Sequence, residues 1–510
     1  MTFNLITDPW ITVSTTAGDS TVSIQDALTD TTGQILDVRG ETPVERAAIL
    51  RLLLAILYQA LEGHDRNPGV LPVDTISAYL TKIRDRFELY DPDMPFMQIP
   101  CLTTTKGPQQ IGELAPEPPV IFSMSLGRTL SNAQAARWLV TLHAADLAGI
   151  KGADRDDPRA IRGKTFPIGA GWLVHAGAHM LTGKTLAQTL LLNLAPAAPS
   201  TRTPWDTPAI PITDYAPPTG TADLYTWQSR RVLLNPTPRI AATVCNGAPT
   251  STLITPKTIP DAVLLDPMAV WFINDTHKVQ PWRPHQLATW VPLQYRLPGI
   301  LTRSHRLGVL DHLIKLVSGG YITPDTLITL DVTAIETDSR YASARHIIHD
   351  QVTLRAGILT GFDPDGANAV IRALTQARNG INAYGRLAKN LTQARGGDHN
   401  AQTGARSEAR DELTHPFIGQ INPFLENIPL GNAAYTEADR WCGVIRDQVT
   451  GAGQSLIEDA SGNPHAIFTN PNQNREMNIP KAESLFFRDL NNIFFYSTRE
   501  EPNENIIIED

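Results

Sequence analysis

The chain has 510 residues, of which 42% are hydrophobic and 19% charged, and its formal net charge is −9. This length is too great for a single hydrophobic core, and this composition excludes a largely disordered protein. The longest apolar run, at residues 49–58, is too short to span a membrane, and three widely spaced cysteines offer no disulfide framework. We therefore expect two or three domains in a reducing, cytoplasmic setting, without a secretory signal.

The first 200 residues combine short strands with helices. Residues 3–6, 11–13 and 21–24 alternate between apolar and polar side chains, which predicts strands. A capping box at residues 42–45, with proline at the first helical position, predicts a helix that ends near Gly63. Further helices are predicted at residues 74–89, from a Ser131 cap to about Gly149, and at residues 186–194.

The pattern changes after a proline-rich stretch. Seven prolines between residues 196 and 218 predict a long surface loop or a seam between subdomains. Strands are predicted beyond it at residues 232–234, 240–244, 270–273 and 327–332, with a helix at 307–317. Helical patterns follow at residues 370–394, 408–413, 434–449 and 481–496. We therefore predict a mixed α/β (α+β) region at residues 1–351 and a C-terminal four-helix bundle at residues 352–510.

One segment fits a loosened phosphate-loop pattern. In residues 178–185, Lys184 would hold terminal phosphates and Thr185 a magnesium ion, between a strand at 172–174 and a helix from 186. However, His, Met and Leu stand where glycines normally let the backbone wrap an anion. The alternative, which we favour, is a polar turn before a helix, with Thr182 as its cap.

Metal and catalytic signals are weak. His346 and His349 are spaced as a helix-compatible pair of ligands, and His175 and His179 form a similar pair. Neither pair has an evident third ligand, and the chain contains no nucleophile-elbow motif. We therefore expect no metal, no cofactor and no catalytic residue.

The distribution of positive charge is more informative than the net charge. An acidic chain is either an ordinary acidic protein or one in which only local patches touch nucleic acid. Between Gly366 and Gly397 there are five cations and no acidic residue. Four of the cations fall within about 120° of one another on a helix, and we call them the basic stripe: Arg372, Arg378, Arg386 and Lys389. The stripe predicts contacts with a phosphate backbone, and the alternative is a solvated face or an acidic partner.

A second basic cluster lies at residues 151–164, where three aspartates dilute it. Glycines at positions 149, 152 and 163 would let the main chain approach a groove or a phosphate closely. The alternative is a helix C-cap followed by a flexible loop.

Three short strings resemble a known family. They are NLITDPWITV at residues 4–13, MPFMQ at residues 94–98 and YTWQSRRV at residues 225–232. In this order and at these separations they resemble the CasA family, the large subunits of the type I-E CRISPR surveillance complex Cascade. The resemblance implies a non-catalytic subunit that inspects duplex DNA for the protospacer-adjacent motif (PAM), largely through the minor groove, and starts strand separation with a wedge. The implied partners are the crRNA-bearing Cascade subunits, the crRNA 5′ handle, the DNA duplex and the CRISPR helicase–nuclease, with no membrane.

The resemblance also implies roles for particular residues. Motif recognition would fall on a glycine loop, Gly149, Ile150, Lys151 and Gly152, and on Lys278, for which His277 is the alternative. The wedge, expected before a helix that leads to the bundle, would be Arg340 and Tyr341, where the family can carry Asn-Gln. Alternatively, Tyr341 is a core aromatic residue and the wedge lies elsewhere.

Other residues are expected to touch RNA or to support the fold. Phe122 and Met124 would contact the crRNA handle or dock to the complex, although Phe122 could equally be buried. The basic stripe would follow the DNA backbone. Trp10, Phe96, Trp227, Arg230 and Arg231 are expected to pack or pair within the fold. Some members of the family carry a cysteine-rich zinc site, and this chain lacks those cysteines. The remaining functional alternatives are a phosphate-loop NTPase that uses Lys184 and a purely structural scaffold.

Overall fold

The structure is a computed structural model that describes most of the chain. The described residues are 2–63, 69–104, 107–110, 130–155, 157–197, 199–200, 202–207, 215–236, 240–250, 253, 265–269, 271–273, 279–281, 305–460, 468–470 and 475–495.

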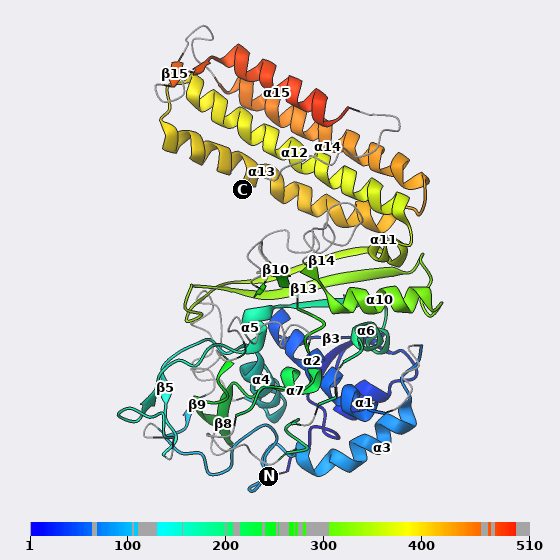
Figure 1. Cartoon of the computed structure of the whole chain (residues 1–510), viewed down its shortest axis with the longest axis vertical. Helices are drawn as coiled ribbons and strands as arrows, with labels where there is room; N and C mark the ends of the chain where they lie inside the picture. The colour runs from blue at the N-terminus through cyan, green and yellow to red at the C-terminus, as the bar shows by residue number, and fades with distance from the viewer. Residues whose placement is uncertain are drawn as a thin grey trace. The chain divides into compact units, whose positions relative to one another are not determined.

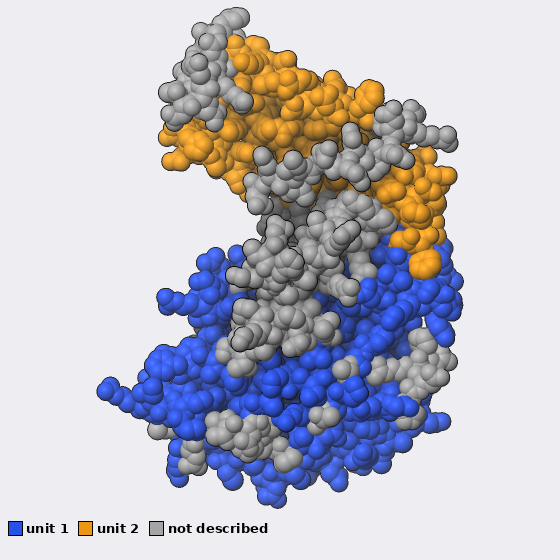
Figure 2. Space-filling view, in the orientation of Figure 1, with its two compact units in different colours: residues 1–360 blue, residues 361–510 orange. Residues whose placement is uncertain are grey.

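The chain forms two compact units, residues 1–360 and residues 361–510 (Figures 1 and 2). The first unit mixes helices and strands and the second is mainly helical, which confirms the predicted fold class. The boundary predicted between residues 351 and 352 lies inside strand β14 (Ala344–Arg355). The units divide after helix α11 (Ala356–Thr360) because this short helix continues directly from the strand.

Unit 1 alternates short strands with helices in an irregular order (Figure 1). Its helices are α1 (Ile24–Thr29), α2 (Pro43–Ala60), α3 (Val73–Ile83), η1 (Arg84–Phe87), α4 (Asn132–Ala145), α5 (Trp172–Ala176), α6 (Leu186–Asn193), α7 (Thr221–Tyr225), α10 (Gly308–Ser318) and α11. Its strands are β1 (Ile11–Thr15), β2 (Gly18–Val22), β3 (Ile35–Val38), β4 (Gln109–Gln110), β5 (Lys151–Gly152), β6 (Lys164–Thr165), β7 (Ala178–Thr182), β8 (Arg230–Asn235), β9 (Ala241–Asn246), β10 (Trp271–Ile273), β11 (Val279–Pro281), β12 (His305–Arg306), β13 (Leu327–Thr337) and β14.

The strands form several small sheets. Strands β14, β13 and β7 make an antiparallel sheet, and helices α2 and α5 pack against its central strand. A second sheet has the order β4-β9-β5-β6, with β8 also paired to β9. A third joins β1 to β2 and β3. The predicted strand at residues 3–6 is wrong: only Asn4 makes an isolated bridge, to Glu88, because the chain turns there.

Helix α2 is the centre of unit 1. Thr42 caps it by accepting a hydrogen bond from the Glu45 amide, as predicted, and the helix ends at Ala60. Nearly all of its side chains are buried, as in a helix surrounded by other elements. Arg51, which interrupts the apolar run, is only 2% exposed and pairs with the buried carboxylate of Asp266 at 3.0 Å. The run therefore lies in a core helix, and the one charged residue within the run, Arg51, is neutralised by its ion pair.

The described part of unit 2 contains four long helices, and Figure 1 shows them side by side. They are α12 (Pro364–Ala394), α13 (His399–Asn427), α14 (Ala433–Glu458) and α15 (Ile479–Ile493), with a small hairpin of β15 (Phe468–Asn470) and β16 (Arg475–Met477). Helix α12 packs against each of the other three. Helix α13 extends well beyond its predicted core at residues 408–413, and Asp398 caps its start. Within the described ranges, no helix has both the length and the apolar character that a membrane crossing requires.

Candidate nucleic-acid interface

The predicted glycine loop lies at the base of a β-hairpin. Helix α4 ends at Ala145, earlier than predicted; Asp146 is extended, and strand β5 begins at Lys151. Strand β5 pairs antiparallel with β6, at the edge of the β4-β9-β5-β6 sheet. We call residues 149–166, which include both strands, the glycine segment.

A tight turn leads into strand β6 of the glycine segment. Ile161 and Lys164 exchange backbone hydrogen bonds of 2.8 and 3.2 Å. Arg162 and Gly163, between them, both have positive φ, at 53° and 73°. This pattern is typical of a type I′ turn, in which glycine is favoured at the second central position. Arg155, Arg162 and Lys164 are exposed, so the segment presents cations to solvent.

The base of the segment is unusual for a water-facing surface. Ile150 and Phe166 flank the paired strands and are 61% and 63% exposed. At Gly149, no described atom lies within 4 Å of where a Cβ would stand, so this glycine is not required by crowding. The segment therefore combines exposed apolar side chains, exposed cations and an unobstructed backbone.

Lys151 is engaged inside the fold. Its ammonium group lies 2.8 Å from the carboxylate of Asp146, which also accepts a hydrogen bond from Nε of Arg230. Burial alone would raise the pKa of Asp146, but the positive charges of Arg230 and Lys151 lower it. Asp146 therefore remains ionised, and it holds the lysine that the resemblance assigns to the groove.

The predicted wedge residues lie in the turn between β13 and β14, residues 338–343, which we call the wedge turn. The Asp338 carboxylate accepts hydrogen bonds from the amides of Ala342 and Ser343 at 2.7 and 3.1 Å, and these bonds lower its pKa. Arg340 is exposed. Tyr341 is half-buried, with its ring 4.2 Å from that of His175, and its φ of 57° is rare for a residue other than glycine. The predicted helix directly after the wedge is wrong. Residues 344–355 form strand β14, which pairs antiparallel with β13 in a hairpin.

The glycine segment and the wedge turn lie together. The amide of Ala148, one residue before Gly149, donates a 2.8 Å hydrogen bond to the carbonyl of Tyr341. Two elements that the resemblance assigns to DNA, far apart in the sequence, are therefore neighbours in unit 1. The other predicted contacts, Lys278 with its alternative His277, and Phe122 and Met124, lie outside the described residues.

The basic stripe is only partly available to an external ligand. Arg372 pairs with Asp439 on α14 and lies over the ring of Tyr435, 5.1 Å from its centroid. Arg386 pairs with Asp489 on α15 at 2.9 Å. Arg378 and Lys389 are half-exposed, and neither forms an ion pair with a described residue. Tyr384, which lies between Arg378 and Arg386 in the sequence, is 2% exposed, and its hydroxyl donates to Glu412.

The structure contradicts the phosphate-loop alternative. Residues Ala178–Thr182 form strand β7, whose backbone pairs with β13 and cannot cradle phosphates. The expected strand before it is helix α5. Thr185, not Thr182, caps helix α6, and the Lys184 amide donates to Gln188 at 2.7 Å.

The geometry of the histidine pair at residues 346 and 349 differs from the one its spacing suggested. His346 and His349 lie on strand β14, where a separation of three places them on opposite faces. His349 lies 3.2 Å from the carboxylate of Asp331, which is buried. Among the described residues, no three His, Cys, Asp or Glu side chains gather as a metal would require.

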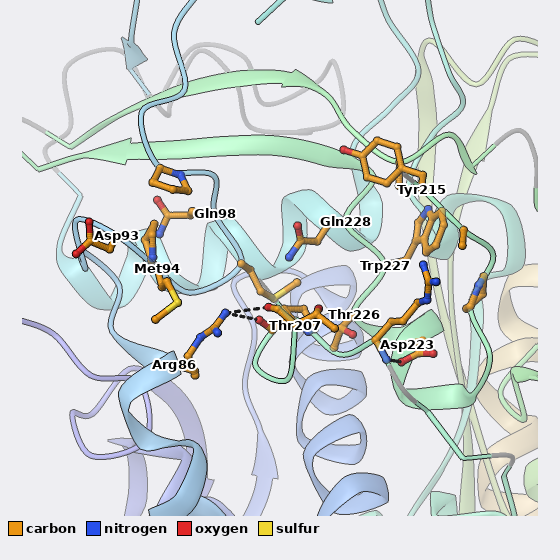
Figure 3. Close-up of a pocket in the computed structure, with 18 residues that line it drawn as sticks. Arg86, Asp93, Met94, Gln98, Thr207, Tyr215, Asp223, Thr226, Trp227 and Gln228 are labelled. Atoms are coloured by element: carbon orange, nitrogen blue, oxygen red, sulfur yellow. Dashed lines mark hydrogen bonds between the residues drawn. The ribbon is translucent and has the colours of Figure 1, made fainter. Parts of the chain in front are cut away.

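Two of the resemblance strings meet around a cavity (Figure 3). Figure 3 shows Met94 and Gln98 on one side and Trp227 on the other, with Gln228 between them. The Gln98 side chain donates to the carbonyl of Leu89 at 2.7 Å and accepts from the amide of Leu234 at 2.7 Å. Side chains of these strings therefore connect segments of unit 1 that are distant in the sequence.

The expected supporting residues do pack and pair within the fold. Trp10 and Phe96 are 0% and 1% exposed. Trp227 packs against a buried apolar cluster, and Arg231 lies 3.5 Å from the carboxylate of Asp154. Arg230 is 1% exposed and pairs with Asp146.

Comparison with known proteins identifies the family. The family model for CRISPR-associated protein Cse1 matches residues 4–452. A CasA/Cse1 protein of Thermus thermophilus is 33% identical over 261 residues, which cover 46% of this chain and 49% of that relative. The match therefore spans about half the length of the relative.

Solved structures share the fold over nearly the whole chain. Cse1 from Thermobifida fusca has a TM-score of 0.82 at 26% identity, covering 97% of this chain and 98% of the other. CasA (Cse1) from Thermus thermophilus has a TM-score of 0.71 at 23% identity, covering 96% and 99%. Because the family model covers most of the sequence and the fold agrees from end to end, the chain belongs to the Cse1 (CasA) family of CRISPR-associated proteins.

Proposed function

We propose that this chain is the large subunit of a crRNA-guided antiviral surveillance complex, in which it recognises the PAM in duplex DNA, helps to open the duplex and recruits the helicase–nuclease. The family match over residues 4–452 carries this proposal. A chain of a CRISPR RNA-guided surveillance complex with the same fold, at a TM-score of 0.64, supports assembly with crRNA-bearing subunits. In this division of labour, base pairing to the guide reads the target and the protein reads the flanking motif.

The neighbouring glycine segment and wedge turn are the proposed motif-reading site. Exposed Arg162 would approach the phosphates, and the open backbone at Gly149 would enter the minor groove, which distinguishes base pairs only coarsely. Tyr341, half-buried against His175, supports the turn, so Arg340 is the better wedge candidate of the two. Lys278 remains the proposed minor-groove lysine.

The proposed backbone contacts are fewer than the stripe predicts. Arg378 and Lys389 would meet phosphates, because no described carboxylate engages them. Arg372 and Arg386 would instead hold the helices of unit 2 together. Phe122 and Met124 remain the proposed contacts to the crRNA 5′ handle.

The test is duplex binding by guide-loaded complex with and without this chain, on targets that differ only in the flanking motif. We expect the chain to confer motif-dependent affinity and Arg340→Ala to reduce it. Lys315→Ala, on helix α10 and away from the glycine segment and the wedge turn in sequence, is the control. Assembly without any motif dependence would leave the chain a structural scaffold and refute the proposal.

A further inference from the structure

Two buried polar side chains lie side by side behind the glycine segment. Arg230 and Asn246 are register partners at the ends of the antiparallel strands β8 and β9. They are 1% and 0% exposed, so neither can touch DNA directly. Their side chains nevertheless reach the chain on both sides of the segment.

Arg230 holds the two ends of the chain that lead into and out of the segment. Its Nη2 donates to the carbonyl of Leu147 at 2.7 Å and to that of Gly169 at 3.2 Å. Its Nε donates to Asp146, the carboxylate that also holds Lys151. One guanidinium therefore holds the backbone just before Gly149 and just after Phe166. A lysine could not replace it, because it lacks the planar array of donors.

Asn246 holds the base of the hairpin itself. Its amide nitrogen lies 2.9 Å from Oγ1 of Thr165 and 3.0 Å from the carbonyl of Phe166, and 3.5 Å from the carbonyl of Gly149. In return, the guanidinium of Arg159, within the segment, donates to the backbone carbonyl of Asn246 at 3.0 Å. The segment and strand β9 are thus tied in both directions.

We propose that Arg230 and Asn246 are positioning residues that set the geometry of the glycine segment for motif recognition; this inference rests on the proposed function. A hairpin held at only one side could pivot, whereas bonds to both sides fix its orientation against the wedge turn, to which Ala148 is already bonded. Pre-organised contacts discriminate better than contacts that must be ordered on binding. Motif discrimination should therefore depend on two residues that DNA never meets.

The experiment compares Asn246→Ala with Asn193→Ala. Asn193 is a matched control: it is 1% exposed, and its side-chain amide likewise bonds backbone atoms, those of Leu181 and Thr189, outside the glycine segment. Guide-loaded complexes with each variant are titrated with duplexes with and without the flanking motif. Hydrogen exchange of residues 149–166 is measured on the whole chain, together with the melting temperature.

We expect Asn246→Ala to lower the ratio of the two affinities by about tenfold and to speed exchange in the segment, through loss of buried hydrogen bonds. Asn193→Ala should lower the melting temperature comparably and leave both readouts unchanged. Equal changes in both variants, or an unchanged ratio for Asn246→Ala, would overturn the inference while leaving the proposed function intact. A wild-type complex without motif discrimination would overturn the proposed function and this inference with it.

Thr165→Val provides a gentler variant if Asn246→Ala does not fold. It removes one acceptor of the Asn246 amide, keeps the side-chain shape and leaves the bond to Phe166 in place. The affinity ratio should fall by roughly threefold, in keeping with the loss of a single neutral hydrogen bond. An unchanged ratio together with unchanged exchange in the segment would contradict the inference.

Discussion

The glycine segment and the basic stripe both gather positive charge in an acidic chain, but they use it differently. In the stripe, Arg372 and Arg386 are paired with carboxylates of neighbouring helices, so half of the charge holds unit 2 together. In the glycine segment, Lys151 and Arg159 are paired, while Arg155, Arg162 and Lys164 remain exposed. A local excess of cations in the sequence therefore does not by itself indicate a nucleic-acid surface. The number of cations available to a ligand depends on how many pair with carboxylates in the fold.

The largest expected difference is between the buried ion pair that supports the glycine segment and a more exposed ion pair of the stripe. Arg230→Ala leaves the Asp146 carboxylate buried with only Lys151 near it, and we expect unit 1 to lose about 3–5 kcal/mol of unfolding free energy. Arg386→Ala breaks a pair whose arginine is 43% exposed and should cost unit 2 about 1 kcal/mol or less. Denaturant unfolding of each variant, followed with probes in each unit, measures both. Equal losses would show that burial does not separate these pairs.

The salt dependence of DNA binding can distinguish the two stripe residues without a described ion pair from the two that are paired with carboxylates. For guide-loaded complex, the double variant Arg378→Gln/Lys389→Gln should reduce the slope of log K against log salt by about 2, because two phosphate contacts are lost. The matched double variant Arg372→Gln/Arg386→Gln should leave that slope unchanged and lower the melting temperature of unit 2. A reversed outcome would mean that the ion pairs open on binding and that the engaged arginines meet the DNA.

Within the glycine segment the same distinction separates Arg162 from Lys151. Arg162 is exposed at the tip of the turn, and Arg162→Ala should weaken duplex binding about fivefold. Lys151→Ala should weaken it less, because Asp146 already holds the ammonium group. Titrations of the two variants at one salt concentration rank them. A larger loss of affinity for Lys151→Ala than for Arg162→Ala would indicate that Lys151 leaves Asp146 and contacts the DNA groove.

The smallest expected effect concerns pH. The hydrogen bond to Asp331 raises the pKa of His349 in the folded state. The resulting stabilisation is fully present below the unfolded value of about 6.5 and is lost as pH rises through the folded value. The difference in melting temperature between wild type and His349→Gln should therefore be larger at pH 6 than at pH 8. A difference that does not vary with pH would show that the proton on His349 does not contribute.

Local sequence signals predicted helix starts well. The caps at Thr42 and Ser131 were identified because capping depends on residues within one turn of each other. The mixed α/β region and the four C-terminal helices follow from hydrophobic periodicity in the same way. The end of helix α4 at Ala145 was misplaced because the extended Asp146 is set by its pairing with Arg230, a residue distant in the sequence.

The candidate site could be predicted only in part for the same reason. The glycine segment and the wedge turn were predicted separately, but the hydrogen bond between Ala148 and Tyr341 that joins them has no local sequence signal. The acidic partners of Arg372 and Arg386 lie on other helices, so the stripe looked unopposed. Residues 178–182 of strand β7 matched the phosphate-loop pattern because a short pattern contains too few residues to distinguish a strand from a loop.

The open space beside Gly149 has a consequence for how this protein can change. Under the proposed function, a change in the flanking motif must be matched by a change in the residues that read it, without loss of the fold. At Gly149 the backbone φ is not positive, and no described atom lies within 4 Å of a Cβ position. A side chain added there projects from the segment without displacing its supports, so under the proposed function a single substitution at this position can alter the motif preference while the fold is kept.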